Sequence, residues 1–338
     1  MRRKQMMVVL LVVMILVVSA CQKVVREGDL MTGEEDDHSP VTTSMLTGSP
    51  GSQTETLGSG IAYSLNESFP GSIIQNIPGF NTSNAIRLQE GEAEFAIFLS
   101  ATMRDAYLGK GIFDEPLMNL RRVAYFFESV YLMVLLEEVG ATSFEDIIEN
   151  QVPLRISTGP AGGLSKEIFI RLLDAYGLTM EDMESWGCRF YEKSLSESVG
   201  MMRDGMLDGS ITLAPNPNAR ITEASANLDF VLITYDDVIL EQLSQEHGYL
   251  IYTISGGTYD FYPDDYHCVA TMITLAASAS ASEDKVYKVT RAIHENEEYM
   301  RVLMPGLREF DLIKMVAGDS IPLHPGAEKF YEDMGVLQ

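Results

Sequence analysis

The chain has 338 residues, of which 46% are apolar and 22% charged, and its formal net charge is −25. This composition indicates a folded globular protein, and the length suffices for roughly two domains. No stretch clusters Lys and Arg as a nucleic-acid footprint requires, which disfavours binding of DNA or RNA. The three cysteines form no CxxC pair, which disfavours a structural zinc site and a dense disulfide scaffold. We predict neither a metal nor a cofactor.

The amino terminus is typical of an export signal. A cationic start at residues 2–4 precedes an apolar run over residues 6–18, which is too short to span a bilayer core of ~30 Å. A serine, an alanine and Cys21 follow, and this ending resembles a bacterial lipoprotein signal, in which the cysteine becomes the acylated amino terminus. We therefore interpret residues 1–20 as a lipoprotein signal peptide and predict acylation of Cys21. The alternative is an ordinary secretory signal in which Cys21 has no role.

The segment that follows the signal is strongly acidic. Residues 21–40 contain six Asp and Glu side chains and little apolar content, which predicts a flexible tether. Farther along the chain, Cys188 and Cys268 either form one disulfide or are both buried as small apolar side chains. The sequence alone favours neither alternative.

Strand and helix signals alternate from Thr42 onward. We expect strands at 41–46, 72–77 and 94–99, with helices over 54–69 and 83–89 between them. This βα order predicts a parallel sheet with helices on its faces.

Capping and spacing signals predict several later helices. Two capping boxes, at 142–145 and 194–197, open helices that we expect to end near Ile148 and Leu207.

Two more helices follow from the same kind of signal. Ser165 is expected to begin a helix that ends at Gly177, and Ser282 a long helix with apolar residues at helical spacing.

Two loops of related sequence, T-G-x-x-G-x, each connect a strand to a helix. They occupy residues 47–52 and 158–163. The first turn of a helix has unpaired N–H groups, and the helix dipole places partial positive charge there. Two such loops that face each other across a cleft predict a site for a small anion. Alternatively, both are plain turns that need glycine for positive φ.

The common catalytic motifs are missing from the sequence, namely the Walker A loop, GxGxxG, GxSxG and HExxH. Residues 282–285 match SxxK, but the motifs that accompany it in enzymes do not occur. We therefore expect a protein that binds and does not catalyse. A secreted α/β-fold enzyme without a recognisable motif is the alternative, and a surface lipoprotein without a ligand is a third.

Several motifs together carry a resemblance to a known family. Residues 321–331 read I-P-L-H-P-G-A-E-K-F-Y, residues 257–259 form a G-T-Y turn, and the two glycine loops occur in the matching order. This pattern resembles the TAXI-family solute-binding receptors of TRAP transporters, which deliver small organic anions to a membrane permease. The resemblance runs from about Thr42 to Gly335.

The resemblance implies a bilobal α/β fold like that of periplasmic binding proteins, with a hinge and a ligand cleft between the lobes. Lobe I would comprise residues 41–134 and 252–338, and lobe II residues 135–251. It also implies a lipid-anchored, extracytoplasmic receptor. Such a receptor captures a small carboxylate or amino acid and passes it to the membrane subunits of a TRAP permease.

The resemblance implies a set of ligand-binding residues, each matched to a position of the family's motifs. The matching residues are Thr47, Gly48, Ser49, Gly51, Ser52, Ser100, Gly162, Gly163, Ser165 and Asn218.

At Glu55 and Arg104 the chain departs from residues that are usually aromatic in the family. We expect Arg104 to clamp a carboxylate and Glu55 to accept from an ammonium group. The alternative is that the two pair with each other or lie on solvated faces.

Overall fold

The computed structural model describes residues 37–50, 52–318 and 320–337. Pro40–Gln338 forms one compact unit, which is the unit considered below. The signal peptide, Cys21 and most of the acidic tether lie outside the described residues, and so does Gly51 of the first glycine loop.

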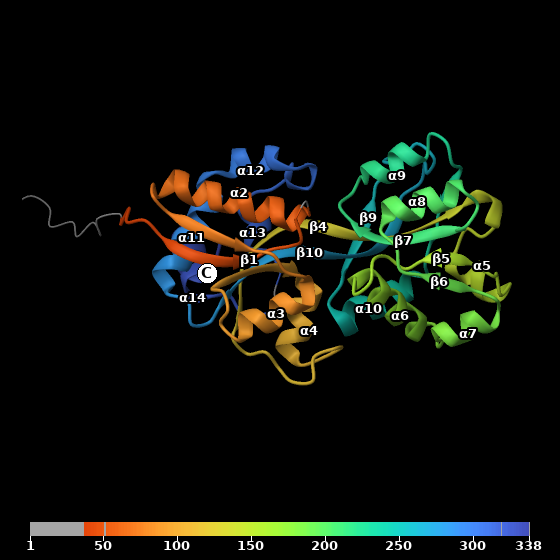
Figure 1. The fold of residues 1–338 in the computed structure, drawn as a ribbon, viewed down its shortest axis with the longest axis horizontal. Coiled ribbons are helices and arrows are strands. Elements are labelled where there is room, and N and C mark those ends of the chain that lie inside the picture. The colour runs from red at the N-terminus through yellow and green to blue at the C-terminus, as the bar shows by residue number, and fades with distance from the viewer. Residues whose placement is uncertain (1–36, 51, 319, 338) are drawn as a thin grey trace, which may run out of the picture. The chain divides into compact units, whose positions relative to one another are not determined.

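The described chain contains one sheet with the strand order β2-β1-β3-β10-β4-β7-β5-β6, in which β8 also pairs with β4 and β9 with β10 (Figure 1). The strands are β1 (Thr42–Leu46), β2 (Ile73–Ile77), β3 (Phe95–Leu99), β4 (Leu120–Leu136), β5 (Arg155–Ser157), β6 (Arg189–Tyr191), β7 (Gly209–Ala214), β8 (Phe230–Leu232), β9 (Leu250–Ile254) and β10 (Tyr266–Ser278).

Helices cover the sheet and alternate with most of its strands. They are α2 (Gln53–Ser68), α3 (Asn81–Gln89), α4 (Ser100–Leu108), α5 (Phe144–Glu149), α6 (Leu164–Ala175), α7 (Met180–Ser185), α8 (Leu195–Arg203), α9 (Ala219–Ala224), α10 (Asp237–His247), α11 (Glu283–Glu295), α12 (Glu297–Leu303), α13 (Leu312–Val316) and α14 (Pro325–Asp333).

Two long strands, β4 and β10, run through both halves of this unit, and we call them the crossing strands. We call β1–β3 with α2–α4 and α11–α14 lobe I, and β5–β9 with α5–α10 lobe II (Figure 1). The main apolar clusters follow this division. One cluster contains Val130–Leu136 and the helices of lobe II, and two others lie on the faces of the lobe I sheet. The expected two-lobed α/β fold is therefore confirmed.

The expectation of a parallel sheet is only partly correct. The pairs β1–β2, β1–β3, β5–β6 and β5–β7 are parallel. The crossing strands, in contrast, are antiparallel to each other and to the strands β3 and β7 beside them. The reason is that the chain enters lobe II along β4 and returns along β10, so the two shared strands run in opposite directions. The lobe boundaries expected at 134 and 252 fall within β4 and β9.

Most of the expected helix starts are present, with small shifts. Ser143 forms a capping box with Asp146, one residue later than the box expected at 142–145, and Ser194 forms the expected one with Glu197. The helix α6 begins at Leu164 and has Gly163 as its N-cap, one residue earlier than expected. The hydroxyl of Ser165 instead donates to the Thr158 carbonyl, which closes the second glycine loop on itself.

The two cysteines of the folded unit are free thiols, and both are buried. The alternative of two buried apolar side chains is therefore confirmed, and the disulfide is not formed. Burial raises the pKa of both thiols, which disfavours the reactive thiolate form.

The closing motif at residues 321–331 holds the last helix against the sheet. The backbone of Arg122 in β4 accepts from His324 N–H at 2.8 Å and donates to the Pro322 carbonyl at 2.9 Å. The His324 Nδ1 accepts from Gly326 N–H at 3.1 Å and so caps α14. A Cβ at Gly326 would lie 2.1 Å from the Glu283 carbonyl oxygen, so only glycine lets α14 approach α11 this closely. The motif therefore has a structural role.

We expect Gly326→Ala to lower the free energy of unfolding by about 1–3 kcal/mol, because the backbone of α11 must move away from the added methyl group. Urea denaturation measures the change. The control is Gly200→Ala in α8, where no atom lies within 4 Å of the added Cβ and alanine favours the helix. A Gly326→Ala protein as stable as the control variant would contradict the assigned contact.

The closing motif also predicts a pH dependence. Burial lowers the pKa of His324 below its usual 6.5, so the neutral ring is favoured in the folded state. The unfolded chain therefore takes up a proton first as the pH falls below about 6.5, and stability is lost there. We expect His324→Asn, which keeps an acceptor for Gly326, to reduce the loss of stability between pH 7 and pH 5. Equal losses in the two proteins would contradict the assignment.

Candidate functional site

Two cavities lie on opposite faces of the crossing strands. The front cavity, about 250 Å³, is lined by Thr47, Gly48, Gln53, Thr54, Asn81, Asn84, Ile97, Phe98, Leu99, Ser129, Leu213 and Ile273. The reverse cavity, about 760 Å³, is lined by Ser100, Arg104, Tyr125, Glu128, Gly248, Leu250, Met272, Glu309, Asp311, Ile313, Lys314, Ala317, Gly318 and Ser320.

The alternation of side chains along the crossing strands separates the two cavities. Glu128 and Met272 are paired in the sheet and line the reverse cavity, whereas the next residues, Ser129 and Ile273, line the front cavity. Between Met272 and Thr274 of β10, the strand β4 has one extra residue. This bulge places Tyr125 on the same face as Glu128, although the two are three residues apart.

The first glycine loop forms one wall of the front cavity through Thr47 and Gly48. A Cβ at Gly48 would lie 2.1 Å from Thr54 Oγ1 and 2.2 Å from Ser52 Oγ, so glycine makes room for two hydroxyl groups. The Ser52 hydroxyl caps α2 by accepting from Glu55 N–H at 3.2 Å. Ser49 is exposed at the edge of this loop.

Two asparagines form another wall, and the sequence analysis missed both. The buried Asn84 amide donates to the carbonyls of Thr47 at 2.8 Å and Ile97 at 3.1 Å. Its Oδ1 has no hydrogen-bond partner among the described residues. Asn81 Oδ1 accepts from Leu99 N–H at 2.8 Å, which fixes the end of β3. The sequence signal that could have identified these two asparagines is the presence of polar residues at the start of a helix that follows a strand.

The front cavity is polar but carries no charged side chain among the described residues that line it. The polar residues that line it include Thr47, Thr54, Asn84 and Ser129, of which Asn84 already donates to two backbone carbonyls. The first turn of α2, at Gln53 and Thr54, lies in the wall and brings the positive end of the helix dipole with it. Such an arrangement stabilises a partial or full negative charge without a cation.

The remaining predicted site residues lie elsewhere. Gly162 and Gly163 belong to the second loop, which contributes none of the described residues that line the front cavity. Ser165 closes that loop, and Asn218 caps α9 through contacts with Arg220 N–H and Ile221 N–H. The structure thus brings Thr47 and Gly48 together with a lobe II residue, Leu213, but not with the second loop.

Glu55 and Arg104 do not lie together at one site. Glu55 lies on α2 and lines neither of the two cavities. Arg104 lines the reverse cavity, and its guanidinium donates to the Glu246 carbonyl of lobe II at 3.1 Å. The stem of Arg104 lies against Gly248, where a Cβ would be 2.7 Å from Arg104 Cδ. Arg104 therefore bridges the two lobes.

A buried ion pair also joins the lobes. The Arg171 guanidinium of α6 donates to Asp105 Oδ2 of α4 at 2.5 Å and to Tyr249 Oη at 2.7 Å, and it also contacts Glu167. The side chains of Arg171 and Asp105 are only 10% and 5% exposed. Burial raises the pKa of Glu167 although Arg171 opposes the rise. The pair thus fixes the spacing of α4 and α6.

We expect the Asp105–Arg171 pair to contribute a coupling energy of about 1–3 kcal/mol to stability, because both groups are desolvated. A double-mutant cycle with Asp105→Asn and Arg171→Gln, followed by urea denaturation, measures it. The exposed pair Arg220–Glu223 on α9 is the matched control, for which about 0.5 kcal/mol or less is expected. Equal coupling in both pairs would contradict the inference.

The described residues contain neither a membrane-spanning helix nor a cluster of metal ligands. No helix among them is both long and apolar enough to cross a membrane. They also contain no group of His, Cys, Asp and Glu side chains placed to hold a metal ion.

Comparison with solved structures finds proteins of low sequence identity. A TctC solute binding protein from Polaromonas is 13% identical, with a TM-score of 0.48 over 80% of this chain and 86% of that one. MatC from Rhodopseudomonas palustris with bound malate is 13% identical, with a TM-score of 0.49 over 79% and 89%. The BenM effector binding domain with benzoate is 12% identical, with a TM-score of 0.43 over 77% and 93%.

A sequence family matches nearly all of the folded unit. The profile of the NMT1-like family covers residues 45–335, from within β1 to the end of the closing motif and α14. The chain belongs to the NMT1-like family.

Proposed function

We propose that the protein is an extracytoplasmic solute-binding receptor that holds a small organic anion in the front cavity. The observation that carries the proposal is the uncharged polar cavity on the crossing strands, with the first turn of α2 in its wall. A carboxylate bound there would accept from hydroxyl, amide and backbone N–H groups. Hydrogen bonds to a charged group contribute about 1.5–3 kcal/mol each, so a few of them suffice for micromolar affinity.

The size of the cavity limits the ligand. At about 250 Å³ the front cavity is slightly smaller than the ~300–1,000 Å³ typical of pockets for drug-sized molecules. A compact carboxylate or an amino acid fits this volume better than a large ligand. Leu213 of lobe II faces Thr47 and Gly48 of lobe I across the cavity, so such a ligand would contact both lobes.

The partner and the anchor are further parts of the proposal. The resemblance of the closing motif and glycine loops to TAXI receptors supports delivery of the ligand to a TRAP permease. The lipoprotein-like ending of the signal supports anchoring through Cys21. Titration of the purified receptor into membranes that contain a candidate permease tests the first of these points.

A ligand screen tests the proposal directly. Thermal-shift measurements with mono- and dicarboxylates and amino acids identify the ligand, and calorimetry measures its affinity. We expect Ser129→Val to weaken binding about tenfold, because the hydroxyl in the floor of the cavity is lost. Ser210→Ala is the control, since Ser210 is a buried strand serine that does not line the cavity. If Ser129→Val binds the ligand as tightly as Ser210→Ala does, the front cavity is not the site.

A further inference from the structure

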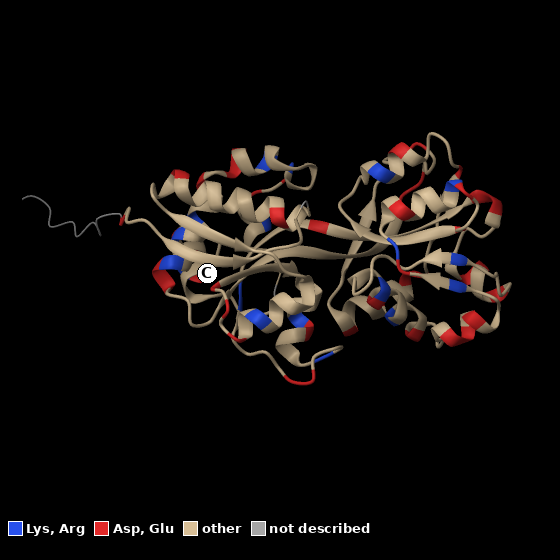
Figure 2. Cartoon of the chain, viewed as in Figure 1, with Lys and Arg blue, Asp and Glu red and all other residues tan. Residues whose placement is uncertain are grey.

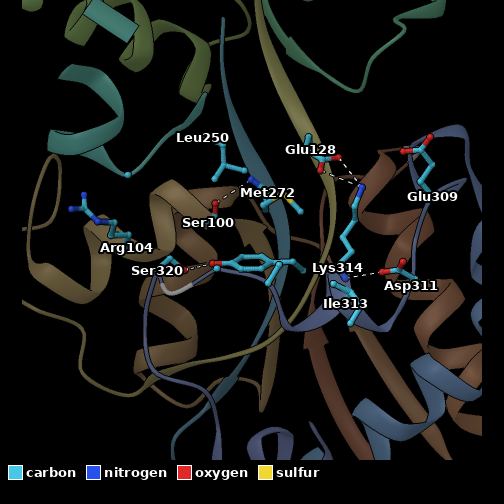
Figure 3. A pocket seen from close by; sticks show the side chains of 14 residues that line it. Ser100, Arg104, Glu128, Leu250, Met272, Glu309, Asp311, Ile313, Lys314 and Ser320 are labelled. Atoms are coloured by element: carbon cyan, nitrogen blue, oxygen red, sulfur yellow. Dashed lines mark hydrogen bonds and ion pairs between the residues drawn. The ribbon is translucent and has the colours of Figure 1, made fainter. Parts of the chain in front are cut away.

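The reverse cavity is the larger of the two, and the proposed function does not use it. Its floor contains Glu128 and Met272 of the crossing strands (Figure 3), and Tyr125 of β4 also lines the cavity. Gly248 and Leu250 of lobe II line one side, and residues between Glu309 and Gly318, together with Ser320, line another. A volume of about 760 Å³ falls within the range of pockets that bind small organic molecules.

Charges in the reverse cavity gather at one end. In Figure 3, Lys314 rises from below toward Glu128, and Glu309 lies beside them, whereas Arg104 lies at the opposite end. The Lys314 ammonium pairs with Glu128 at 3.2 Å. Asp311 accepts from Lys314 N–H at 2.8 Å and so caps α13. Glu309 has no ion-pair partner among the described residues, so this end has an excess of negative charge.

The middle of the reverse cavity is apolar. Leu250, Met272 and Ile313 face it together with the ring of Tyr125, whose hydroxyl is hydrogen-bonded to Ser320 (Figure 3). An apolar body placed there is removed from water, and aromatic rings also favour contact with thioether sulfur. The reverse cavity therefore has a carboxylate-rich end next to an apolar middle.

We propose that the reverse cavity binds a small organic amine, with its ammonium group against Glu309 at the end that holds the Glu128–Lys314 pair and its apolar body over Tyr125 and Met272. An ammonium ion donates three hydrogen bonds, so it can bind Glu309 and share the Glu128 carboxylate with Lys314. This site is separate from the front cavity and does not rest on the proposed function.

Calorimetry with phenethylamine and its carboxylate counterpart 3-phenylpropionate tests the proposal on the purified full-length protein. The two probes share the aromatic ring and differ in the sign of their charge. We expect the amine to bind and the carboxylate to bind at least tenfold more weakly. Equal binding of both, preference for the carboxylate or binding of neither would overturn the proposal.

Two variants with opposite expected effects locate the bound amine. Glu309→Gln removes the unpaired carboxylate and is expected to weaken amine binding about three- to tenfold. Lys314→Met removes the cation that competes for Glu128 and is expected to strengthen amine binding by a similar factor. The controls are Glu332→Gln and Lys329→Met on α14, which change the net charge equally but lie outside the cavity.

These controls separate a site from a general effect of charge. If the α14 variants change amine affinity as much as the cavity variants do, the attraction is long-range and the cavity is not the site. None of these measurements involves the front cavity or its anion, so a failure here leaves the receptor proposal standing. Failure of the carboxylate screen would likewise leave the amine site standing.

Discussion

The structure depends on two antiparallel strands that belong to both lobes at once. The strand β4 pairs with β10 over most of its length, and each of the two also pairs with shorter strands on its other edge. The β4–β10 ladder joins Leu120–Val130 to Ala270–Ser278, and β4 continues beyond it to pair with β7 and β8 in lobe II. Changes in lobe spacing are therefore confined to bending or twisting of this strand pair. The Asp105–Arg171 and Arg104–Glu246 contacts restrain that movement further.

Local features of the fold were predictable from the sequence, and long-range pairing was not. The first three strands and the two helices between them, together with the Ser143 and Ser194 caps, follow from nearby residues. The crossing strands are almost completely buried on both faces, so their apolar runs show no alternation. The pairing of Glu128 with Met272, which are far apart in the chain, has no local signal.

The same limit applies to the candidate site. The first glycine loop was found because its pattern is contiguous, whereas Ser129, Asn81 and Asn84 enter the front cavity through the fold. The motif that carries the strongest resemblance, at residues 321–331, holds α14 against β4 and α11. Residues that maintain the fold are shared among proteins with different ligands. A resemblance based on them therefore indicates the architecture of a binding protein more securely than its ligand.

The distribution of charge reconciles an acidic protein with an anionic ligand. Figure 2 shows Asp and Glu residues spread over the helices and loops of both lobes. Their fields are screened within about 8 Å by physiological salt, whereas the front cavity is lined by neutral groups. The negative charge of Glu128 lies one residue away from Ser129, which lines the front cavity. Its carboxylate points to the reverse face and is paired with Lys314, so little of its charge acts on the front side. The alternation of a single strand thus separates the neutral lining of the front cavity from the charged lining of the reverse cavity.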